Sequence, residues 1–367
     1  HQRSGLDWNI DNRIYETIDP IRYRYQNGRF EADTLPNPAG QWGLTHDDYG
    51  RVYFSRAAAG VAASGFQINP GYGLLDFQDA FEEGFNQVWP IIKTPDVNGG
   101  AKTLRADSTM ATFTSICGQS VFRGDRLSKS IQGDYIAAEP VARIIRRANI
   151  RNKDGKIFLS NVYQKDEFIS SSDMNFRPVN TYTGPDGCLY LVDMYRGIIQ
   201  ESTWAQPGTY LYNQIMTKGL DRNIKRGRIY RLVYDGIAPG PTPKMLNEST
   251  QKLVTYLAHP NGWWRDNAQK EIIVRKDQSV VPLLKQIALG QRSILSESPA
   301  VLTRIHALWT LEGLTALYKT LLLTIIKDKN PELRKMAIWA GEPLIQKNDR
   351  QLLEQLEPLK NDESYDV

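Results

Sequence analysis

The stretch Gly43-Leu44-Thr45-His46-Asp47-Asp48-Tyr49-Gly50-Arg51-Val52-Tyr53-Phe54 decides the fold, because its pattern occurs twice more. Residues 178–191 (PVNTYTGPDGCLYL) form a second copy, and residues 5–15 (GLDWNIDNRIY) form a looser third. Each copy predicts a short strand, an Asp-rich tight turn and an apolar strand that carries a tyrosine. Repeated units of this kind favour radial or stacked repetition, and for β units the usual result is a propeller.

Alternating apolar residues between turn signals indicate strands over most of the first 235 residues. The clearest segments are Arg13–Ile18, Arg22–Tyr25, Arg51–Ser55, Ser115–Phe122, Tyr135–Ala138, Ala142–Arg147, Ile157–Asn161, Cys188–Val192 and Arg228–Tyr234. Residues 57–112 are less regular and are expected to form a functional or lid-like insertion. We therefore predict a β-propeller over residues 1–235. Without the insertion, this length builds about four or five blades at ~40–45 residues per blade, so we expect the ring to be incomplete at its N-terminus.

The composition changes near residue 236, where a Pro- and Gly-rich segment predicts a linker over residues 236–248. Beyond it, three Arg-x-x-Ala motifs begin at Arg265, Arg304 and Arg334 on amphipathic helical patterns, each followed by a second apolar helical run. Paired helices at this spacing predict an α-solenoid of HEAT-like repeats over residues 249–360, and a generic helical bundle is the alternative. Each motif arginine is expected to reach a carbonyl or an acidic side chain of the preceding repeat.

Composition excludes several classes of protein. The chain has 367 residues with a formal net charge of +4 and no Lys/Arg block, so no nucleic-acid partner is predicted. No apolar run approaches the ~20 residues that a membrane-spanning helix needs. Cys117 and Cys188 form no CxxC or CxxCH motif, so the sequence shows neither a zinc site nor a haem attachment site. They could form a disulfide, but the apolar strand patterns around both favour buried thiols.

Several of these segments resemble one protein family. Residues 175–199 (NFRPVNTYTGPDGCLYLVDMYRGII) resemble the last complete blade of sorbosone/glucose dehydrogenase-like propellers, and residues 226–232 (RGRIYRL) resemble their closing strand. Residues 43–54, 122–125, 133–140, 259–266 (HPNGWWRD) and 308–314 (LWTLEGL) fit the same group. The sequence is similar to large membrane-bound dehydrogenase proteins of Bacteroidetes- and Planctomycetes-type bacteria. Those proteins join such a propeller to HEAT repeats and often to a C-terminal c-type cytochrome domain.

This resemblance implies a quinoprotein-like sugar or polyol dehydrogenase, or its propeller subunit, in the periplasm or at the cell surface. Such a protein uses pyrroloquinoline quinone (PQQ) and passes electrons to a c-type cytochrome, which is the expected partner. The sequence has no cytochrome motif of its own, so the electron acceptor is expected on another segment or chain. The alternative is a non-catalytic binding or assembly subunit of an extracytoplasmic or cell-envelope complex, because solenoids offer long interaction surfaces.

The candidate site is expected at the mouth of the propeller, at the strand ends opposite the Asp turns. Asp193 and Glu139 occupy corresponding places in their blades and are predicted to be catalytic, accepting a proton from a sugar hydroxyl. The predicted substrate- or cofactor-binding residues are Arg177, Tyr195, Arg196, Arg123 and Arg56, because arginine forms bidentate contacts with carboxylates. Salt-bridged loops at the mouth are an equal alternative. His46 and the turn aspartates lie on the far face, where a structural role is predicted, and no metal site is predicted.

Overall fold

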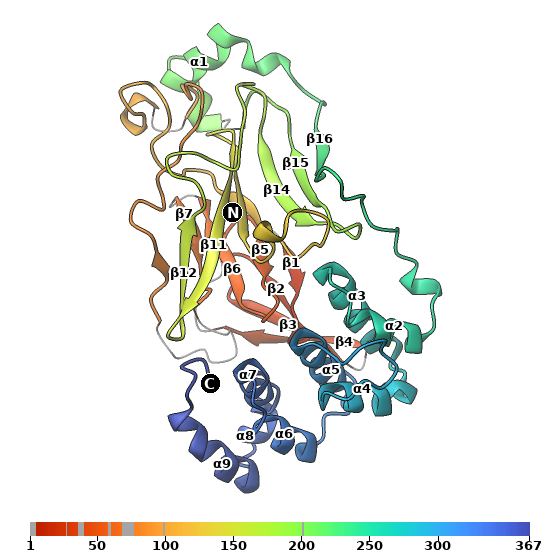
Figure 1. The fold of residues 1–367 in the computed structure, drawn as a ribbon. Coiled ribbons are helices and arrows are strands. Elements are labelled where there is room, and N and C mark those ends of the chain that lie inside the picture. The colour runs from red at the N-terminus through yellow and green to blue at the C-terminus, as the bar shows by residue number, and fades with distance from the viewer. Residues whose placement is uncertain are drawn as a thin grey trace.

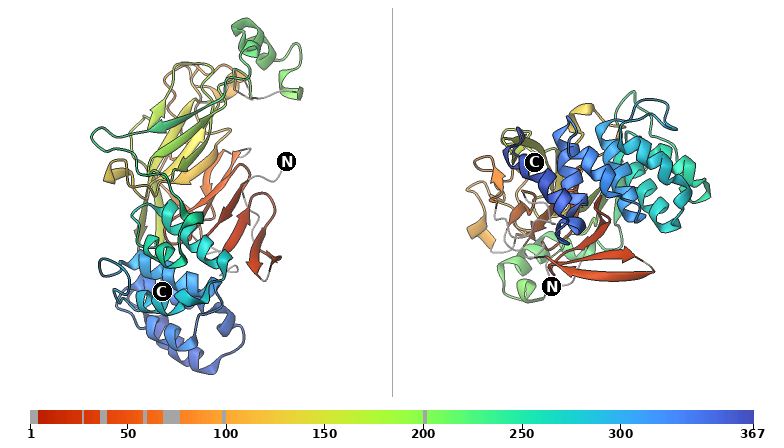
Figure 2. Two further views of the ribbon diagram at one scale, coloured as in Figure 1. Left: turned by 90° about the vertical axis from the view of Figure 1, so that its right-hand side faces the viewer. Right: turned by 90° about the horizontal axis from the view of Figure 1, so that it is seen from below.

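Four small sheets follow one another along the chain, and a helical region comes after them (Figure 1). The computed structural model describes residues 5–26, 28–35, 40–57, 60–67, 77–97, 100–199 and 202–367. Within these ranges the strands form open sheets and no closed barrel. The molecule is elongated, with the helical region at one end and α1 (Tyr210–Lys218) at the other (Figure 2).

Each sheet is built mainly from antiparallel neighbours in chain order. The first comprises β1 (Leu6–Trp8), β2 (Arg13–Glu16), β3 (Ile21–Gln26) and β4 (Arg29–Thr34). The second comprises β5 (Leu44–His46), β6 (Val52–Arg56) and β7 (Val61–Ser64). The third comprises β9 (Cys117–Val121), β10 (Tyr135–Glu139), β11 (Ile144–Lys153) and β12 (Lys156–Asn161), with β8 (Ala80–Phe81) and β13 (Ile169–Ser170) added at its edges. The fourth comprises β14 (Pro178–Thr183), β15 (Leu189–Asp193) and β16 (Arg228–Leu232).

The first strands of successive sheets lie side by side: β1 contacts β5, β5 contacts β9, and β9 contacts β14. Gly118 on β9 allows β9 and β14 to lie close together. Its φ is +52°, and a Cβ atom there would lie 2.0 Å from the Val179 carbonyl oxygen. Only glycine fits this contact, because any side chain would collide with the backbone of β14. Next to it, the Thr181 hydroxyl donates to the Gly118 carbonyl at 3.1 Å.

The three sequence repeats share one hydrogen bond that explains why each contains both an aspartate and a tyrosine. In each hairpin the tyrosine hydroxyl of the second strand donates to the turn aspartate: Tyr15 to Asp11 at 2.6 Å, Tyr53 to Asp47 at 3.0 Å and Tyr190 to Asp186 at 2.8 Å. The other carboxylate oxygen accepts backbone amides of the turn, as Asp47 does from Tyr49 and Arg51. The aspartate thus closes the turn and also fixes the strand that follows.

All nine of the strand segments predicted from the sequence contain a strand. The region over residues 57–112 differs from the expected lid. Its described part supplies β7 to the second sheet and β8 to the third. Phe85, Val88, Val97 and Met110 are buried in the core beneath those sheets. These apolar side chains keep the described part of the segment packed inside the molecule rather than over an opening.

The helical region consists of α2 (Thr250–Tyr256), α3 (Gly262–Arg275), α4 (Val281–Ala288), α5 (Val301–Gly313), α6 (Lys319–Ile325), α7 (Pro331–Ala340), α8 (Glu342–Ile345) and α9 (Arg350–Leu356). The three Arg-x-x-Ala motifs lie on α3, α5 and α7, and α5 packs between the other two. Arg304 donates to the Ala288 carbonyl at 3.0 Å, and Arg334 donates to the Asp328 carbonyl at 2.8 Å. Each of these arginines therefore binds the end of the preceding helix pair, as the motif predicted. None of the described helices is long and apolar enough to cross a membrane.

The helices dock on the turn ends of the repeated hairpins. The Asn12 side chain in the first turn donates to the Trp309 carbonyl of α5 at 2.8 Å. Gly50 in the second turn packs against the ring of Trp339 on α7. In the third turn, the Pro185 carbonyl accepts the indole N–H of Trp264 on α3 at 2.7 Å. The Asp turns are therefore the surface that joins the two regions, which is the far face expected from the sequence.

The two cysteines are buried and unbridged. Cys117 begins β9, and Cys188 precedes β15. Burial raises the pKa of Cys117 above the ordinary thiol range, so this side chain behaves as a small apolar residue.

Candidate ligand-binding site

A small polar cavity lies at the junction of the sheets and the helical region. It is lined by Asp7, Thr45, His46, Ser120, Val121, Arg123, Tyr182, Thr183, Trp263, Asp266, Asn267 and Lys270. We call it the junction pocket. Its volume is about 50 Å³, which is room for a few water molecules or one small polar group. The pocket can therefore enclose part of a ligand, and the rest would lie against its rim.

Helix α3 forms one wall because the spacing of Trp263, Asp266 and Lys270 places them on one face of the helix. The helix begins at Asn261, whose side chain accepts the Trp263 amide at 2.9 Å and caps the first turn. The Asn261 amide group also donates to the Gly184 carbonyl at 3.0 Å. A single capping residue thus ties the start of α3 to the β14–β15 turn and fixes the wall against the sheets.

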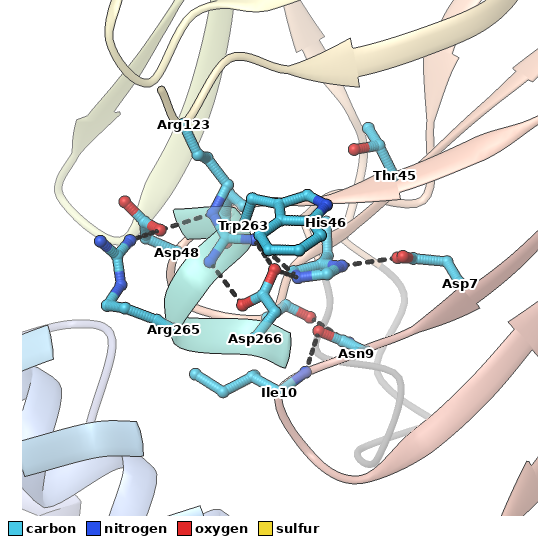
Figure 3. Close-up of polar contacts among 12 residues, drawn as sticks. Asp7, Asn9, Ile10, Thr45, His46, Asp48, Arg123, Trp263, Arg265 and Asp266 are labelled. Carbon is cyan, nitrogen blue, oxygen red and sulfur yellow. Dashed lines mark hydrogen bonds and ion pairs between the residues drawn. The ribbon is translucent and has the colours of Figure 1, made fainter. Parts of the chain in front are cut away.

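His46, the last residue of β5, lies between two carboxylates at the base of the pocket (Figure 3). Its Nδ1 is 2.6 Å from Asp7 Oδ2, and its Nε2 is 3.5 Å from Asp266 Oδ2. The Arg123 Nη1 atom approaches the same Nε2 to 2.9 Å. The imidazole is therefore held from both sides: Asp7 of β1 contacts one ring nitrogen, and Asp266 of α3 and Arg123 contact the other.

Arg123 connects the sheets to α3 through two aspartates. Its guanidinium forms a bidentate pair with Asp266, with Nη1–Oδ2 and Nη2–Oδ1 distances of 2.7 and 2.9 Å. Its Nε donates to Asp48, which also accepts from Arg265 of α3. Bidentate pairs of this kind are among the strongest polar contacts in proteins. We call Asp7, His46, Asp48, Arg123, Arg265 and Asp266 the junction network.

Charge balance sets the protonation of the junction network. Burial alone would raise the pKa of Asp266, but Arg123 and His46 hold it well below its usual range. Burial likewise opposes ionisation of Asp48, and Arg265 and Arg123 lower its pKa below the usual range. Burial alone would lower the pKa of His46, whereas the flanking carboxylates raise it to about 9. Three carboxylates and two guanidiniums leave one negative charge, so a protonated His46 makes the buried network neutral.

A second histidine beneath Asp266 has the opposite behaviour. The His306 Nδ1 atom is 2.7 Å from the Gln269 side-chain oxygen, and its Nε2 lies 4.0 Å from Asp266 Oδ1. Burial, followed by the nearby Arg265, lowers the pKa of His306 to about 3. His306 is therefore neutral at pH 7, and His46 alone carries a histidine charge in this part of the molecule.

These charges define what the junction pocket can do. A protonated His46 cannot act as a general base at neutral pH, and both of its ring nitrogens already face protein groups, so it contributes charge to the network rather than a free donor. Lys270 is half-buried in the wall and has no carboxylate partner within the described ranges. The rim adds two aromatic side chains, Trp263 and a Tyr182 that is 60% exposed. Aromatic faces beside polar donors suit sugars and polyols, which present both C–H and hydroxyl groups.

Among the residues predicted as the site, Arg177 is completely buried. Its guanidinium donates to the carbonyls of Pro140, Arg196 and Gly197 and pairs with Asp96. With every donor directed at the protein, Arg177 holds three segments of chain together. Asp96 also pairs with the buried Arg143 at 2.9 Å, so it has no charge to spare for a ligand.

The two predicted catalytic carboxylates are also turned inward. Glu139 is fully buried, and its Oε2 accepts the backbone amides of residues 114–115 at 3.1 and 2.8 Å. Burial raises the pKa of Glu139 to about 7. Asp193 is 1% exposed, and its Oδ1 accepts the amides of Arg177 and Tyr195 at 2.8 and 2.7 Å. Both carboxylates stabilise backbone turns, and their catalytic roles stay predictions.

The remaining predicted residues separate in space. Tyr195 and Arg196 follow β15 near Arg177, and the Tyr195 ring faces solvent beneath the Arg228 guanidinium, whose Cζ lies 3.4 Å from the ring centroid. Arg123 lies instead in the junction network, at the turn end of the sheets. Arg56 is exposed at the end of β6. The structure thus gathers Glu139, Arg177, Asp193, Tyr195 and Arg196 at one end of the sheets but places Arg123 at the other.

Neither the predicted quinone nor a metal has a suitable set of ligands here. PQQ carries three carboxylates and needs several available cations around a wide cavity. Arg177 and Arg123 already bind carboxylates of the protein, and the junction pocket measures only about 50 Å³. The junction pocket and these two arginines therefore do not fit this cofactor. The described residues also contain no group of three or more His, Cys, Asp or Glu placed to hold a metal ion.

Sequence reasoning missed most of the junction pocket. It assigned His46 a structural role, and it singled out neither Asp7 nor Lys270. Asp266 and Trp263 were noted only as part of the segment HPNGWWRD. One signal was present. In the segment HPNGWWRD an aromatic pair precedes an Arg-Asp dipeptide, and this order indicates the start of a helix whose polar residues face another charged surface. Its partner surface could not be read, because Asp7, His46 and Arg123 are far apart along the chain.

Comparison with known proteins identifies the family of the sheet region. The chain belongs to the family described as a domain of unknown function (DUF7133), whose model matches residues 1–236. No curated protein matches the sequence significantly. Among solved structures, an oxidoreductase described as a glucose dehydrogenase, from Thermus thermophilus, is similar at 11% identity and a TM-score of 0.23, over 60% of this chain and 75% of that chain. A TM-score this low does not establish a shared fold.

Proposed function

We propose that this chain is the sugar- or polyol-binding propeller subunit of an extracytoplasmic, quinoprotein-like dehydrogenase. The junction pocket is the ligand site, and the redox cofactor and the cytochrome that accepts electrons belong to other segments or chains. Two features of the chain support the proposal. The four sheets contact one another through their first strands, as propeller blades do. The sequence segments from residue 43 to residue 266 resemble those of dehydrogenase propellers.

One observation carries the ligand assignment: a small polar pocket has an aromatic rim and, in its wall, Lys270, which has no carboxylate partner within the described ranges. Because no described carboxylate pairs with Lys270, its ammonium group is available to donate to a hydroxyl or carboxylate oxygen of the ligand. Trp263 and Tyr182 give the sugar ring an apolar face to rest on. The pocket therefore binds one polar group of the ligand inside and the ring outside.

Tryptophan fluorescence and calorimetry test ligand binding directly. Purified protein is titrated with a panel of aldoses, sugar acids and polyols, and the same panel is used in dye-linked oxidation assays with and without added PQQ. We expect saturable binding of at least one sugar or polyol, with a change in Trp263 fluorescence. We expect no PQQ-dependent turnover by this chain alone, because the junction pocket does not fit the quinone and the predicted catalytic residues Glu139 and Asp193 are held by backbone amides.

Matched tryptophan variants locate the signal. Trp263→Phe removes the fluorescence change and weakens binding, whereas Trp204→Phe, at an exposed position outside the pocket, leaves both intact. A panel that produces no saturable binding contradicts the ligand assignment. PQQ-dependent oxidation by the isolated chain contradicts the placement of the cofactor on another segment.

The second candidate function is an assembly module, and the edge strand β16 favours it. Ile229, Val233 and Tyr234, on this strand and just after it, are 68%, 56% and 49% exposed. An apolar edge of this kind suits a protein partner, for which the expected c-type cytochrome is the first choice. Native mass spectrometry of the chain co-expressed with such a cytochrome tests it. A lone monomer contradicts the module, whereas a complex lost on Ile229→Lys supports it.

A further inference from the structure

A second hollow lies at the opposite end of the molecule from the helical region, beside α1. It is lined by Met174, Asn175, Tyr195, Lys218, Gly219, Leu220, Arg222, Asn223 and Arg226. We call it the basic hollow. Its volume is about 610 Å³, within the range of sites that bind drug-sized ligands. Met174 and Leu220 are its only apolar lining residues among those described, so it lacks the hydrophobic anchors of a protein-binding groove.

Unpaired positive charge distinguishes the basic hollow. Lys218, Arg222 and Arg226 form no ion pair with any described residue. Lys225 and Arg228 lie in the same stretch of chain, which gives five cations within residues 218–228. The acidic residues nearby are Asp173, Asp193 and Asp221. Five cations against three carboxylates leave an excess of two positive charges.

The shape of the hollow comes from the end of α1. Gly219 ends the helix in the left-handed conformation, with φ of +61°, and turns the chain toward β16. The Asn223 amide group donates to the Tyr195 carbonyl at 2.7 Å, which ties the returning chain to the end of β15. The cations thus stand on a fixed backbone rather than on a free tail. A fixed array of unpaired cations binds a polyanion at less entropic cost than a disordered one.

We propose that the basic hollow binds an acidic oligosaccharide whose negative charges are carboxylates. Arginine forks fit carboxylates bidentately. Asn175 and Asn223 line the hollow and can accept sugar hydroxyls through their side-chain oxygens, because both side chains bond to the protein through their N–H groups. A nucleic acid fits less well: Tyr195 is the one aromatic lining residue among those described, and Arg228 covers a face of its ring, so bases find little to stack on. This inference does not depend on the function proposed for the junction pocket.

Calorimetry with defined oligomers tests it. The full chain is titrated with oligogalacturonate, a sulfated oligosaccharide, neutral malto-oligosaccharide and single-stranded oligo-dT, all at about 150 mM NaCl to suppress weak surface electrostatics. We expect saturable binding of oligogalacturonate and none of the neutral oligomer. Absence of oligogalacturonate binding overturns the proposal. Binding of the sulfated oligomer alone overturns the carboxylate assignment, and equal or tighter binding of oligo-dT overturns the carbohydrate assignment.

Charge-reversal variants place the site. Arg222→Glu combined with Arg226→Glu is expected to weaken oligogalacturonate binding at least tenfold. Lys347→Glu combined with Arg350→Glu changes the net charge equally on an exposed part of the helical region and is expected to leave binding unchanged. Circular dichroism and thermal melting show that both double variants fold. An equal loss of binding in the two variants overturns the proposal, because it would reflect net charge alone.

Discussion

The two ends of the β14–β15 hairpin use charged residues in opposite ways. At the turn end, near Thr183, the junction network brings together six buried or half-buried charged groups that neutralise one another. At the other end, near Tyr195, the basic hollow leaves Lys218, Arg222 and Arg226 without partners in the described chain. The hairpin strands are only six and five residues long, so the two sites are separated by one short strand.

The difference shows which charges hold the fold and which are free for binding. A buried charge must be paired, since an isolated one costs several kcal/mol, so the junction network is part of the structure that joins sheets and helices. Exposed cations cost little when unpaired and gain free energy only when an anion arrives. The same type of substitution should therefore have a large effect on stability at the first site and almost none at the second.

The largest expected effect is that of Asp266→Asn. This change removes one carboxylate from the junction network and leaves Arg123 and His46 as excess buried cations. We expect a loss of about 3–5 kcal/mol in the free energy of unfolding, measured by urea denaturation. Asp221→Asn, at an exposed position by the basic hollow, is the matched control and should change stability by less than about 0.5 kcal/mol. Similar losses in both variants would contradict the comparison.

The next largest effect is a pH dependence of the free energy of unfolding, which we expect to arise from His46 in the junction network. Because the folded protein raises the pKa of His46 from 6.5 to about 9, protonation stabilises the fold. This contribution is complete below about pH 6.5 and is lost as the pH rises through about 9, for a change of up to about 3 kcal/mol. Urea unfolding at about pH 6, 7.5 and 9.5 brackets this window and measures it. In His46→Gln this decline should be absent, and a parallel decline in the variant would show that other groups cause it.

A smaller effect is the loss of stability when an Asp turn loses its tyrosine hydrogen bond, and this loss should differ between the first and the third turn. Tyr15→Phe leaves the buried Asp11 without its hydroxyl donor and should cost about 2 kcal/mol, since an unsatisfied buried acceptor is expensive. Tyr190→Phe removes the same bond from Asp186, but that carboxylate also binds Arg231, so about 1 kcal/mol is expected. Thermal melting of the two variants ranks them. A larger loss for Tyr190→Phe would contradict this account of the repeat.

The smallest effect is expected at the basic hollow. Arg222→Glu combined with Arg226→Glu breaks no ion pair within the described residues, so the free energy of unfolding should change by less than about 0.5 kcal/mol. Urea denaturation at about 150 mM NaCl, where surface charges are screened, measures the change. A loss of several kcal/mol would mean that these arginines hold the fold, and the contrast between the two ends would disappear.

Local pattern was enough to predict most of the secondary structure. The Asp turns, the tyrosine strands and the Arg-x-x-Ala helices are all read from neighbouring residues, and all three occur in the structure. The candidate site was harder to predict. Arg177, Glu139 and Asp193 were chosen because they follow or precede strands, yet burial and backbone hydrogen bonds occupy each of them. Sequence position alone does not tell whether a charged side chain turns outward to a ligand or inward to a carbonyl.

The sequence by itself determined the order of sheets and helices, because strand and helix periods are properties of adjacent residues. The tertiary structure alone decided that Asp7, His46, Arg123 and Asp266 meet in one buried network, while Lys218, Arg222 and Arg226 stay unpaired among the described residues. The physical reason is that charge pairing depends on distance in space. Residues far apart along the chain, such as Asp48 and Arg265 at a separation of 217 positions, become neighbours only after the helices dock on the Asp turns.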